Sequence, residues 1–474
     1  MHGRLGTRAL TLIIANNDRR GGWTRKCEMR IGIVGAGMVG VATALELALD
    51  GHEVRVFDRH GGAASESSFA HAGIVCAALQ APAGGLTPLR PHHGLGHSAL
   101  QRCTPGHLGW LMSARRAHRL GHAEQAARDM QTLTHLSQER MRSLRHQFQL
   151  DHERCEGLLV LLRTPAELKA VNQALSGLDE AATEQHRLID AQTCLSIEPG
   201  LNPDTPLEAG IHLPQAEVGN AREFALLLKN EAQRLGVQFR FHTTVSQIEA
   251  SSQPSLVHCY TPPEQNSAPH AASRVDESRS SEGPATAPYS HEPERERFDA
   301  IVICAAQQST ALLRPLGIPL HLYALTGCSI TAQLRQMEAF PHLGPQGALI
   351  DLKHQISISR IGQRVRVSGG AQLGPLGGAR EAQVMAALHK VLHDWFPGAA
   401  QGGVQRWRGV RSIVADGLPV LGKSSAPGIW LNLAHGSSGW AQACGSARML
   451  AEQIAGVSDT HTLSSLTPDR ASLQ

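Results

Sequence analysis

Three glycines near the start of the chain have the spacing of a phosphate-binding turn. Gly35, Gly37 and Gly40 stand in the order Gly-x-Gly-x-x-Gly. The first glycine permits a tight turn, the second lets a ligand approach the backbone, and the third lets a helix pack closely on a strand. A helix that begins here offers free N–H groups and the positive end of its dipole to phosphates. The spacing therefore predicts a site for the pyrophosphate of a dinucleotide.

The elements around this turn form a predicted βαβ unit. Arg30–Gly35 is a short apolar run closed by glycine, which is typical of a buried parallel strand. Met38–Asp50 follows as a helix and Glu53–Asp58 as a second strand. Asp58 ends that second strand, where a carboxylate is placed to bind ribose hydroxyls. This pattern by itself does not distinguish FAD from NAD.

Further pieces of the same domain are predicted much later in the chain. Asn220–Leu235 has a helical pattern, Val237–Glu249 is strand-like, and Phe298–Cys304 is another buried strand. Gly428–Leu433 is a strand and Trp440–Ala455 a helix that ends at a glycine. The dinucleotide-binding domain is therefore expected to be discontinuous, with a second domain inserted in parts.

The intervening blocks differ in character. Residues 105–195 are rich in helical patterns, whereas residues 319–397 carry alternating strand patterns. The fold class expected is α/β, with a discontinuous Rossmann-like FAD-binding domain and a mixed-sheet α+β substrate domain. The expected boundaries are a disordered leader at 1–28, FAD-binding segments at 29–104, 205–318 and 405–457, substrate-domain segments at 105–204 and 319–404, a disordered insertion at 261–297 and a tail at 458–474.

Composition excludes several classes of protein. The 474 residues are 42% hydrophobic and 18% charged, and the formal net charge of +3 argues against a nucleic-acid binder. The nine cysteines never form a Cys-x-x-Cys pair, which favours reduced thiols and a cytoplasmic location. His92, His93 and His97 fit no standard zinc spacing, so we expect no metal site.

No apolar run approaches the ~18 residues that cross a bilayer. Leu10–Ala15 is a poor signal peptide, and Met29, just before the first strand, would make a natural start. Leu108–His122 carries apolar and basic residues and is interpreted as an ordinary amphipathic helix. The alternative is contact with a membrane surface, which would place the protein peripherally at the inner face of the cell membrane.

Six segments give the chain a specific resemblance. They are Ile31–Arg59, Glu66–Gly73, Gly236–Val245, Ile356–Leu373, Trp407–Gly422 and Ile429–Leu450. In order and spacing they resemble the FAD-dependent D-amino acid oxidase superfamily. The last segment, IWLNLAHGSSGWAQACGSARML, is the most specific.

The resemblance implies that FAD is the cofactor. It places Glu66–Gly73 near the flavin, Val245 behind the adenine, and the helix that opens at Gly436–Trp440 with its N-terminus toward the flavin. The dipole of such a helix would stabilise the negative charge of reduced flavin. The cofactor-binding residues implied are Val34, Gly35, Ala36, Gly37, Met38, Val39, Gly40, Asp58, Arg59, Ser68, Gly73, Val245, Gly436, Ser438, Gly439 and Trp440.

The resemblance also implies residues for the substrate. Arg411 matches an arginine that binds the substrate carboxylate, and a planar guanidinium suits a carboxylate in two-point contact. Tyr323 matches an aromatic position near the substrate. The chain departs from the family at five positions, where it has Ser412 for proline, His71 for asparagine, Ala306 for glycine, Thr326 for lysine and Cys328 for tyrosine.

The expected reaction is oxidative deamination of D-amino acids to 2-oxo acids and ammonia by hydride transfer to flavin. The electrons then pass to an acceptor other than oxygen, such as a membrane quinone or another respiratory component. Three alternatives remain open. They are an oxidase or dehydrogenase of another small amine (glycine, sarcosine or proline), a flavin-binding protein that has lost turnover, and an NAD dehydrogenase.

Overall fold

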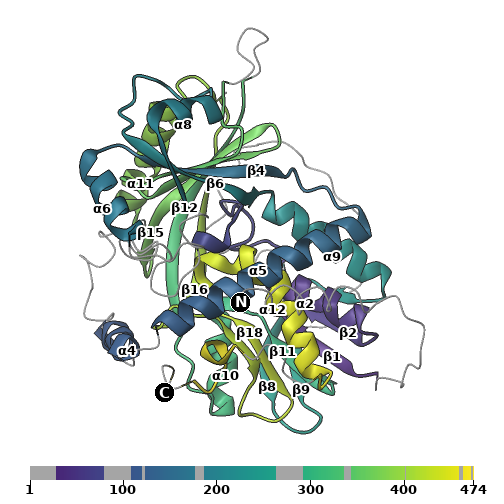
Figure 1. Cartoon of the computed structure of the whole chain (residues 1–474). Helices are drawn as coiled ribbons and strands as arrows, with labels where there is room; N and C mark the ends of the chain where they lie inside the picture. Colours follow the sequence, from purple (N-terminus) through teal and green to yellow (C-terminus); the bar gives the residue numbers. More distant parts are fainter. Residues whose placement is uncertain are drawn as a thin grey trace, which may run out of the picture.

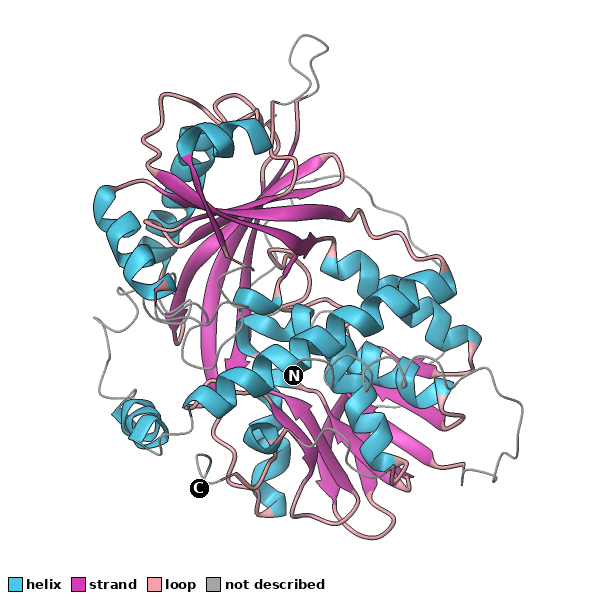
Figure 2. Ribbon diagram, in the orientation of Figure 1, coloured by secondary structure: helices cyan, strands magenta, loops and turns pink. Residues whose placement is uncertain are grey.

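The structure is a computed structural model that describes residues 28–79, 108–119, 123–176, 186–262, 292–335, 343–400, 402–457, 463–470 and 473. Two large sheets dominate the described part, one in the lower half and one in the upper half of Figure 1. Helices lie between and around these sheets (Figure 2). The predicted division into a Rossmann-like body and a second, mixed sheet is confirmed.

The lower sheet has six strands in the order β17-β18-β11-β1-β2-β7. All neighbouring strands run parallel except β17 and β18. Its central strands are mostly apolar, because both faces are covered: helices pack on one face, and Ile248 and Leu256 belong to the core on the other. The bounds are β1 Arg30–Val34, β2 Glu53–Phe57, β7 Gln238–Arg240, β11 Ala300–Ile303, β17 Val420–Lys423 and β18 Ile429–Leu433.

Four helices pack together over this sheet. Helix α2 (Met38–Leu49) contacts α9 (Ala221–Arg234) and α12 (Gly439–Ile454), and α12 contacts α5 (Ala123–Phe148). The buried Glu46 of α2 accepts hydrogen bonds from Arg140 of α5 at 2.7 and 2.9 Å and from Arg448 of α12 at 3.2 Å. This pairing of a buried carboxylate with two guanidiniums ties the three helices into one layer.

The upper sheet has nine strands, and its main path follows the order β16-β12-β15-β14-β13-β4-β6-β3 with β5 paired to β6. Helix α11 (Gly378–Trp395) buries Leu388 and Trp395 against it. Helices α6 (Pro165–Leu175) and α8 (Ala191–Ile197) contact β4 and β5–β6. The strand bounds are β3 Ile74–Val75, β4 Cys155–Leu162, β5 Arg187–Asp190, β6 Ala209–Val218, β12 Tyr323–Gln333, β13 Ala348–Asp351, β14 Ile356–Ile361, β15 Arg364–Leu373 and β16 Gln405–Ile413.

A small antiparallel sheet and two shorter helices complete the described fold. The small sheet contains β8 (Thr243–Glu249), β9 (Ser255–Tyr260) and β10 (Glu294–Arg297). Helix α10 (Ser309–Leu313) lies near β8, and α4 (Leu108–Arg119) places Trp110 against the end of the upper sheet.

The structure corrects several predicted boundaries. Strand β6 pairs with β4, and β16 pairs with β12, so both belong to the upper sheet rather than to the FAD-binding segments that begin at 205 and 405. Helix α5 was expected in the substrate domain, but it packs on α12 because its apolar face is buried there. Nothing in a helical pattern says which sheet the helix will cover, so this assignment needed long-range contacts.

The predicted insertion is corrected as well, and part of the tail is described. Glu294–Arg297 form β10 and pair with β9, so the predicted disordered insertion at 261–297 extends too far at its C-terminal end. Residues 263–291 and almost all of the leader lie outside the described residues. In the tail, Arg470 forms a buried ion pair with Asp416 at 2.7 Å, so this part of 458–474 is docked on the body of the protein.

Candidate functional site

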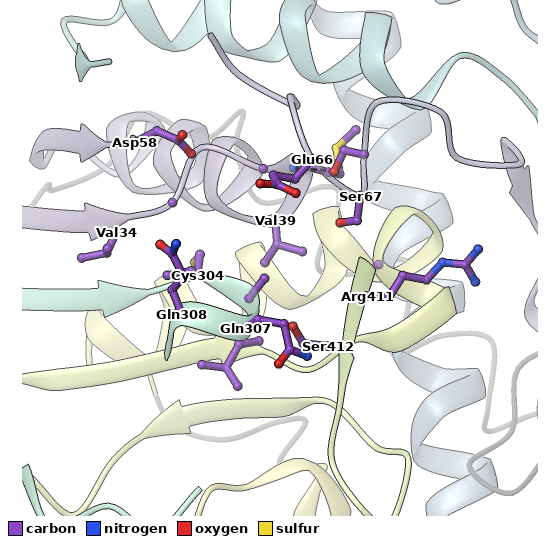
Figure 3. Close-up of a pocket in the computed structure, with 18 of the residues that line it drawn as sticks. Val34, Val39, Asp58, Glu66, Ser67, Cys304, Gln307, Gln308, Arg411 and Ser412 are labelled. Atoms are coloured by element: carbon purple, nitrogen blue, oxygen red, sulfur yellow. Dashed lines mark hydrogen bonds between the residues drawn. The ribbon is translucent and has the colours of Figure 1, made fainter. Parts of the chain in front are cut away.

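A cavity of about 400 Å³ lies at the carboxyl ends of β1, β2, β11 and β18, where strand β16 of the upper sheet reaches the lower one (Figure 3). Ligands of open α/β sheets bind at this edge because loops and helix N-termini converge there. Most of the predicted cofactor residues line the cavity. They are Val34, Gly35, Gly37, Met38, Val39, Asp58, Arg59, Ser68, Val245, Gly436, Gly439 and Trp440, together with Arg411.

The three glycines of the turn each meet a different steric condition. Gly35 has φ +104°, and a Cβ there would lie 2.6 Å from the Cys304 carbonyl oxygen. A Cβ on Gly40 would collide with the Gly35 carbonyl oxygen, so only glycine lets α2 begin this close to β1. Around a Cβ on Gly37, the one heavy atom of the described residues within 4 Å would be Ser68 Oγ, at 3.9 Å. The protein thus leaves open the space that a pyrophosphate would occupy.

The N-terminus of α2 is free to act as an anion site. Gly37 caps the helix without a side-chain hydrogen bond, and no acidic residue stands in the first turn. The Met38 N–H donates to Ser68 Oγ at 3.2 Å, and the other N–H groups of the first turn and the helix dipole face the cavity without a carboxylate from the turn itself. The donor set fits the phosphates of a dinucleotide.

Asp58 joins the turn to the end of β2. Its carboxylate accepts hydrogen bonds from the Ala36 N–H at 2.7 Å and the His60 N–H at 2.8 Å. Hydrogen bonds to Asp58 and Glu66 raise the pKa of His60 to about 9, so this imidazole is cationic at neutral pH. Burial alone would raise the pKa of Glu66, but hydrogen bonds from His60 and Arg59 lower it to about 2.

A buried hydrogen-bond chain holds the opposite wall. His435 Nε2 lies 2.8 Å from Asn432 Oδ1, whose amide nitrogen donates to Thr43 Oγ1 at 3.1 Å on α2. Burial lowers the pKa of His435 to about 4, so the ring is neutral and has one N–H to donate. His435 Nδ1 lies 3.2 Å from the side-chain amide oxygen of Gln442 on α12. The chain fixes α2, β18 and α12 relative to one another.

Arg411 lies at the end of the cavity nearest the N-terminus of α12. Its Nη1 donates to Ser437 Oγ at 2.8 Å, and the Ser437 carbonyl lies 3.3 Å from His71 Nε2. His71 Nδ1 accepts from the Gly73 N–H at 3.1 Å, so Nε2 carries the proton and donates to Ser437. Burial and the nearby Arg411 lower the pKa of His71 to about 4, which leaves Arg411 beside a neutral ring.

Four predicted cofactor residues do not line the cavity but support it. Gly40 provides the close helix packing, and Ala36 donates its N–H to Asp58. The Gly73 carbonyl accepts from Trp440 Nε1 at 3.0 Å, and the Ser438 N–H donates to the His435 carbonyl at 2.9 Å. Their contribution is to backbone geometry around the cavity.

Tyr323 does not line the cavity. Its ring lies 6.3 Å from that of Trp110, edge to face, and its carbonyl accepts from Gln307 Nε2 at 2.7 Å. The predicted role beside the substrate therefore gains no support from its position. Thr326 and Cys328 are buried on the face of β12 opposite Gly327, with Cys328 packed in the core under α11. Their departure from the family pattern does not alter the cavity.

Some cavity residues were missed from the sequence. Cys304, Ala305, Ala306, Gln307 and Gln308 follow β11, and His435 follows β18. The signal was available, since residues after a parallel strand reach the same edge as the glycine turn. Their order along this edge depends on strand pairing that the sequence does not reveal.

The described residues contain neither a cluster of metal-ligating side chains nor a membrane-spanning helix. No group of His, Cys, Asp and Glu side chains there has the arrangement of a metal site, and His92, His93 and His97 lie outside them. No described helix is long and apolar enough to cross a membrane.

The family model described as FAD dependent oxidoreductase matches residues 30–453. The chain belongs to this family. Its cofactor is accordingly FAD, and the open glycine turn, the two helix N-termini and Asp58 form a site that fits this dinucleotide.

Full-length relatives support the same assignment. The chain is 33% identical over 443 residues to a D-amino acid dehydrogenase of Methylobacterium nodulans, which covers 90% of this chain and 96% of the relative. It is 30% identical over 452 residues to a D-amino acid dehydrogenase of Bradyrhizobium diazoefficiens, covering 93% and 99%. Among solved structures, glycine oxidase from Geobacillus kaustophilus superposes with a TM-score of 0.67 at 18% identity, covering 94% and 99% of the two chains.

Ala306 lines the cavity with φ +48°, a left-handed conformation that costs alanine more than glycine. We expect Ala306→Gly to raise the free energy of unfolding of the holoenzyme by about 0.5–1 kcal/mol. Chemical denaturation with excess FAD measures this. Ala305→Gly is the control, because Ala305 has φ −87° and the change there should destabilise. Equal losses for both variants would contradict the strain at Ala306.

The neutral buried histidines predict a loss of stability in acid. A histidine whose pKa falls from 6.5 to about 4 on folding, as at His435, binds a proton more readily when unfolded. The contribution of this histidine to stability is therefore constant above pH 6.5 and falls by up to about 1 kcal/mol per pH unit as the pH drops from 6.5 toward 4. Below pH 4 its contribution levels off. His435→Asn should be less stable than the parent at pH 7.5 but lose less between pH 6.5 and 4.5. Parallel pH profiles of the unfolding free energy, with excess FAD, would contradict this assignment.

Proposed function

We propose that this enzyme oxidises D-amino acids to 2-oxo acids and ammonia, as a D-amino acid dehydrogenase. The observation that carries the proposal is Arg411, a guanidinium held by Ser437 at the end of the FAD cavity next to the N-terminus of α12. An amino-acid carboxylate is the group that a planar guanidinium binds best. The printed names of the full-length relatives support the same substrate class.

In the proposed mechanism, Arg411 binds the carboxylate and fixes the orientation of Cα. FAD, when bound, would supply the hydride acceptor for oxidation of Cα, and loss of a proton from the amino nitrogen would leave an imino acid. Water then converts the imino acid to the 2-oxo acid and ammonia. We assign no general base, because an amine that arrives neutral needs none. The protein therefore contributes orientation and electrostatics.

The charge balance around Arg411 suits this role. His71 and His435 stay neutral at physiological pH, so Arg411 is not opposed by a second cation from either ring. The N-terminus of α12 adds a positive dipole end without an acidic side chain in its first turn. Both features favour an anionic substrate group here and negative charge on reduced flavin.

The reduced flavin would require an electron acceptor to complete the cycle, and we propose one other than oxygen. A quinone or another respiratory component would fit a dehydrogenase. A second substrate class is another small amine such as glycine, sarcosine or proline, which the structural likeness to a glycine oxidase brings into consideration.

An anaerobic stopped-flow screen tests the substrate class. The holoenzyme is mixed with D- and L-amino acids, glycine, sarcosine and proline, and flavin bleaching is followed. We expect D-amino acids to reduce the flavin fastest. Faster reduction by glycine or sarcosine would favour the second class, and bleaching by none of them would contradict both.

Replacement of Arg411 should weaken substrate use without loss of FAD. Arg411→Leu should lower kcat/KM for the best amino acid by roughly thirty- to a thousandfold, about 2–4 kcal/mol. Arg411→Lys should recover only part of this, because an ammonium lacks the planar fork. Arg408→Leu is the matched control, since Arg408 on the same strand binds Glu381 instead. Wild-type kinetics in Arg411→Leu would remove the main support for the proposal.

Gly327 makes room for the Arg411 guanidinium. A Cβ there would lie 3.3 Å from Arg411 Nη2, tighter than ordinary contact, whereas a Cβ on its strand partner Gly409 meets nothing nearer than 3.4 Å. We expect Gly327→Ala to shift the guanidinium and raise KM about three- to tenfold with little change in FAD content. Gly409→Ala should change KM less. Steady-state kinetics with one amino acid compare the two, and equal KM values for Gly327→Ala and the parent would contradict the steric argument.

A further inference from the structure

Ser412 presents a buried hydroxyl to the FAD cavity. The residue is 6% exposed and lines the cavity, and its Oγ has no hydrogen-bond partner among the described residues. A hydroxyl that is buried without a hydrogen-bond partner gives up its hydrogen bonds to water and gains none in the protein, which costs about 1–3 kcal/mol. Because Ser412 lines the FAD cavity, the bound cofactor is a candidate partner for this hydroxyl.

Burial without a partner is not informative by itself, because the upper sheet contains other such hydroxyls. Ser359 on β14 is fully buried and its Oγ also has no partner within the described residues. Ser359, however, does not line the cavity. Both serines are buried on strands of the upper sheet and only Ser412 lines the cavity, so Ser359 serves as a control for it.

The direction of Ser412 separates it from the substrate arginine. Successive side chains of a strand point to opposite faces, so Ser412 and Arg411 leave β16 on opposite sides. In Figure 3 the Arg411 side chain extends to the right, away from the other labelled residues, whereas Ser412 lies among cavity residues that follow β11. The hydroxyl thus faces the body of the dinucleotide cavity rather than the carboxylate anchor.

We propose that the Ser412 hydroxyl hydrogen-bonds bound FAD and strengthens its binding. FAD carries carbonyl, ring nitrogen and hydroxyl groups, and a serine hydroxyl both donates and accepts. Ser412 is therefore a cofactor-binding residue of this chain.

The test compares FAD affinity in Ser412→Ala, Ser412→Thr and Ser359→Ala. Free FAD fluoresces more strongly than bound FAD, so dilution of each holoenzyme yields a dissociation constant. Ser412→Ala should bind FAD about tenfold more weakly, which corresponds to about 1.4 kcal/mol. Ser412→Thr keeps the hydroxyl and should retain most of the affinity, and Ser359→Ala should match the parent.

Two further measurements make the outcome decisive. The visible absorption bands of the bound flavin should shift in Ser412→Ala but not in Ser359→Ala, and the melting temperature with saturating FAD identifies any variant that is merely misfolded. An unchanged dissociation constant for FAD in folded Ser412→Ala overturns the proposal. This is the result expected if a water molecule were the partner of the hydroxyl. A raised KM with unchanged FAD affinity also overturns it and assigns the hydroxyl to the substrate. These readouts do not depend on which amine the enzyme oxidises.

Discussion

The architecture depends on one steric constraint, the close approach of α2 to the end of β1. Gly40 lies against the Gly35 carbonyl, and Gly35 itself occupies a left-handed conformation beside the Cys304 backbone. Any larger residue would push the helix away from the strand. Since the helix N-terminus must face the cavity, this contact determines where phosphates can sit. The clamp of Glu46 by Arg140 and Arg448 then holds the far part of the helix.

The electrostatics of the cavity divide along its length. At the Asp58 end, the cationic His60 lies between the carboxylates of Asp58 and Glu66 and pairs with both. Its positive charge therefore offsets part of their negative charge. At the Arg411 end, the buried rings of His71 and His435 are neutral because burial disfavours their protonated form. An anionic substrate group at that end therefore meets the Arg411 guanidinium and a helix dipole, without an added positive charge from either ring.

Local patterns predicted the part of the fold that depends on nearby residues. The glycine turn, Asp58, the strands β1, β2, β11 and β18, and α12 all follow from short-range periodicity and turn chemistry. The membership of β6 and β16 in the upper sheet did not, because pairing partners lie far away in sequence. Likewise β10 is polar and strongly charged, and only its pairing with β9 makes it a strand. In the site, Arg411 was predicted by resemblance. The direction of the Ser412 side chain and the position of Tyr323 outside the cavity depend on how the strands pack, which the sequence does not show.

The docking of α5 has a consequence for how the protein behaves as a whole. This helix lies in the chain between β3 and β4, both strands of the upper sheet, yet its apolar face is buried on α12 of the lower body. The chain therefore passes repeatedly between the lower sheet with its helices and the upper sheet with its helices. Neither of these two parts is formed by one continuous segment of the chain. A flavin-binding fragment cannot be released by one or two proteolytic cuts. Because α5 connects two strands of the upper sheet, its packing on α12 joins that sheet to the helix that begins at the flavin cavity.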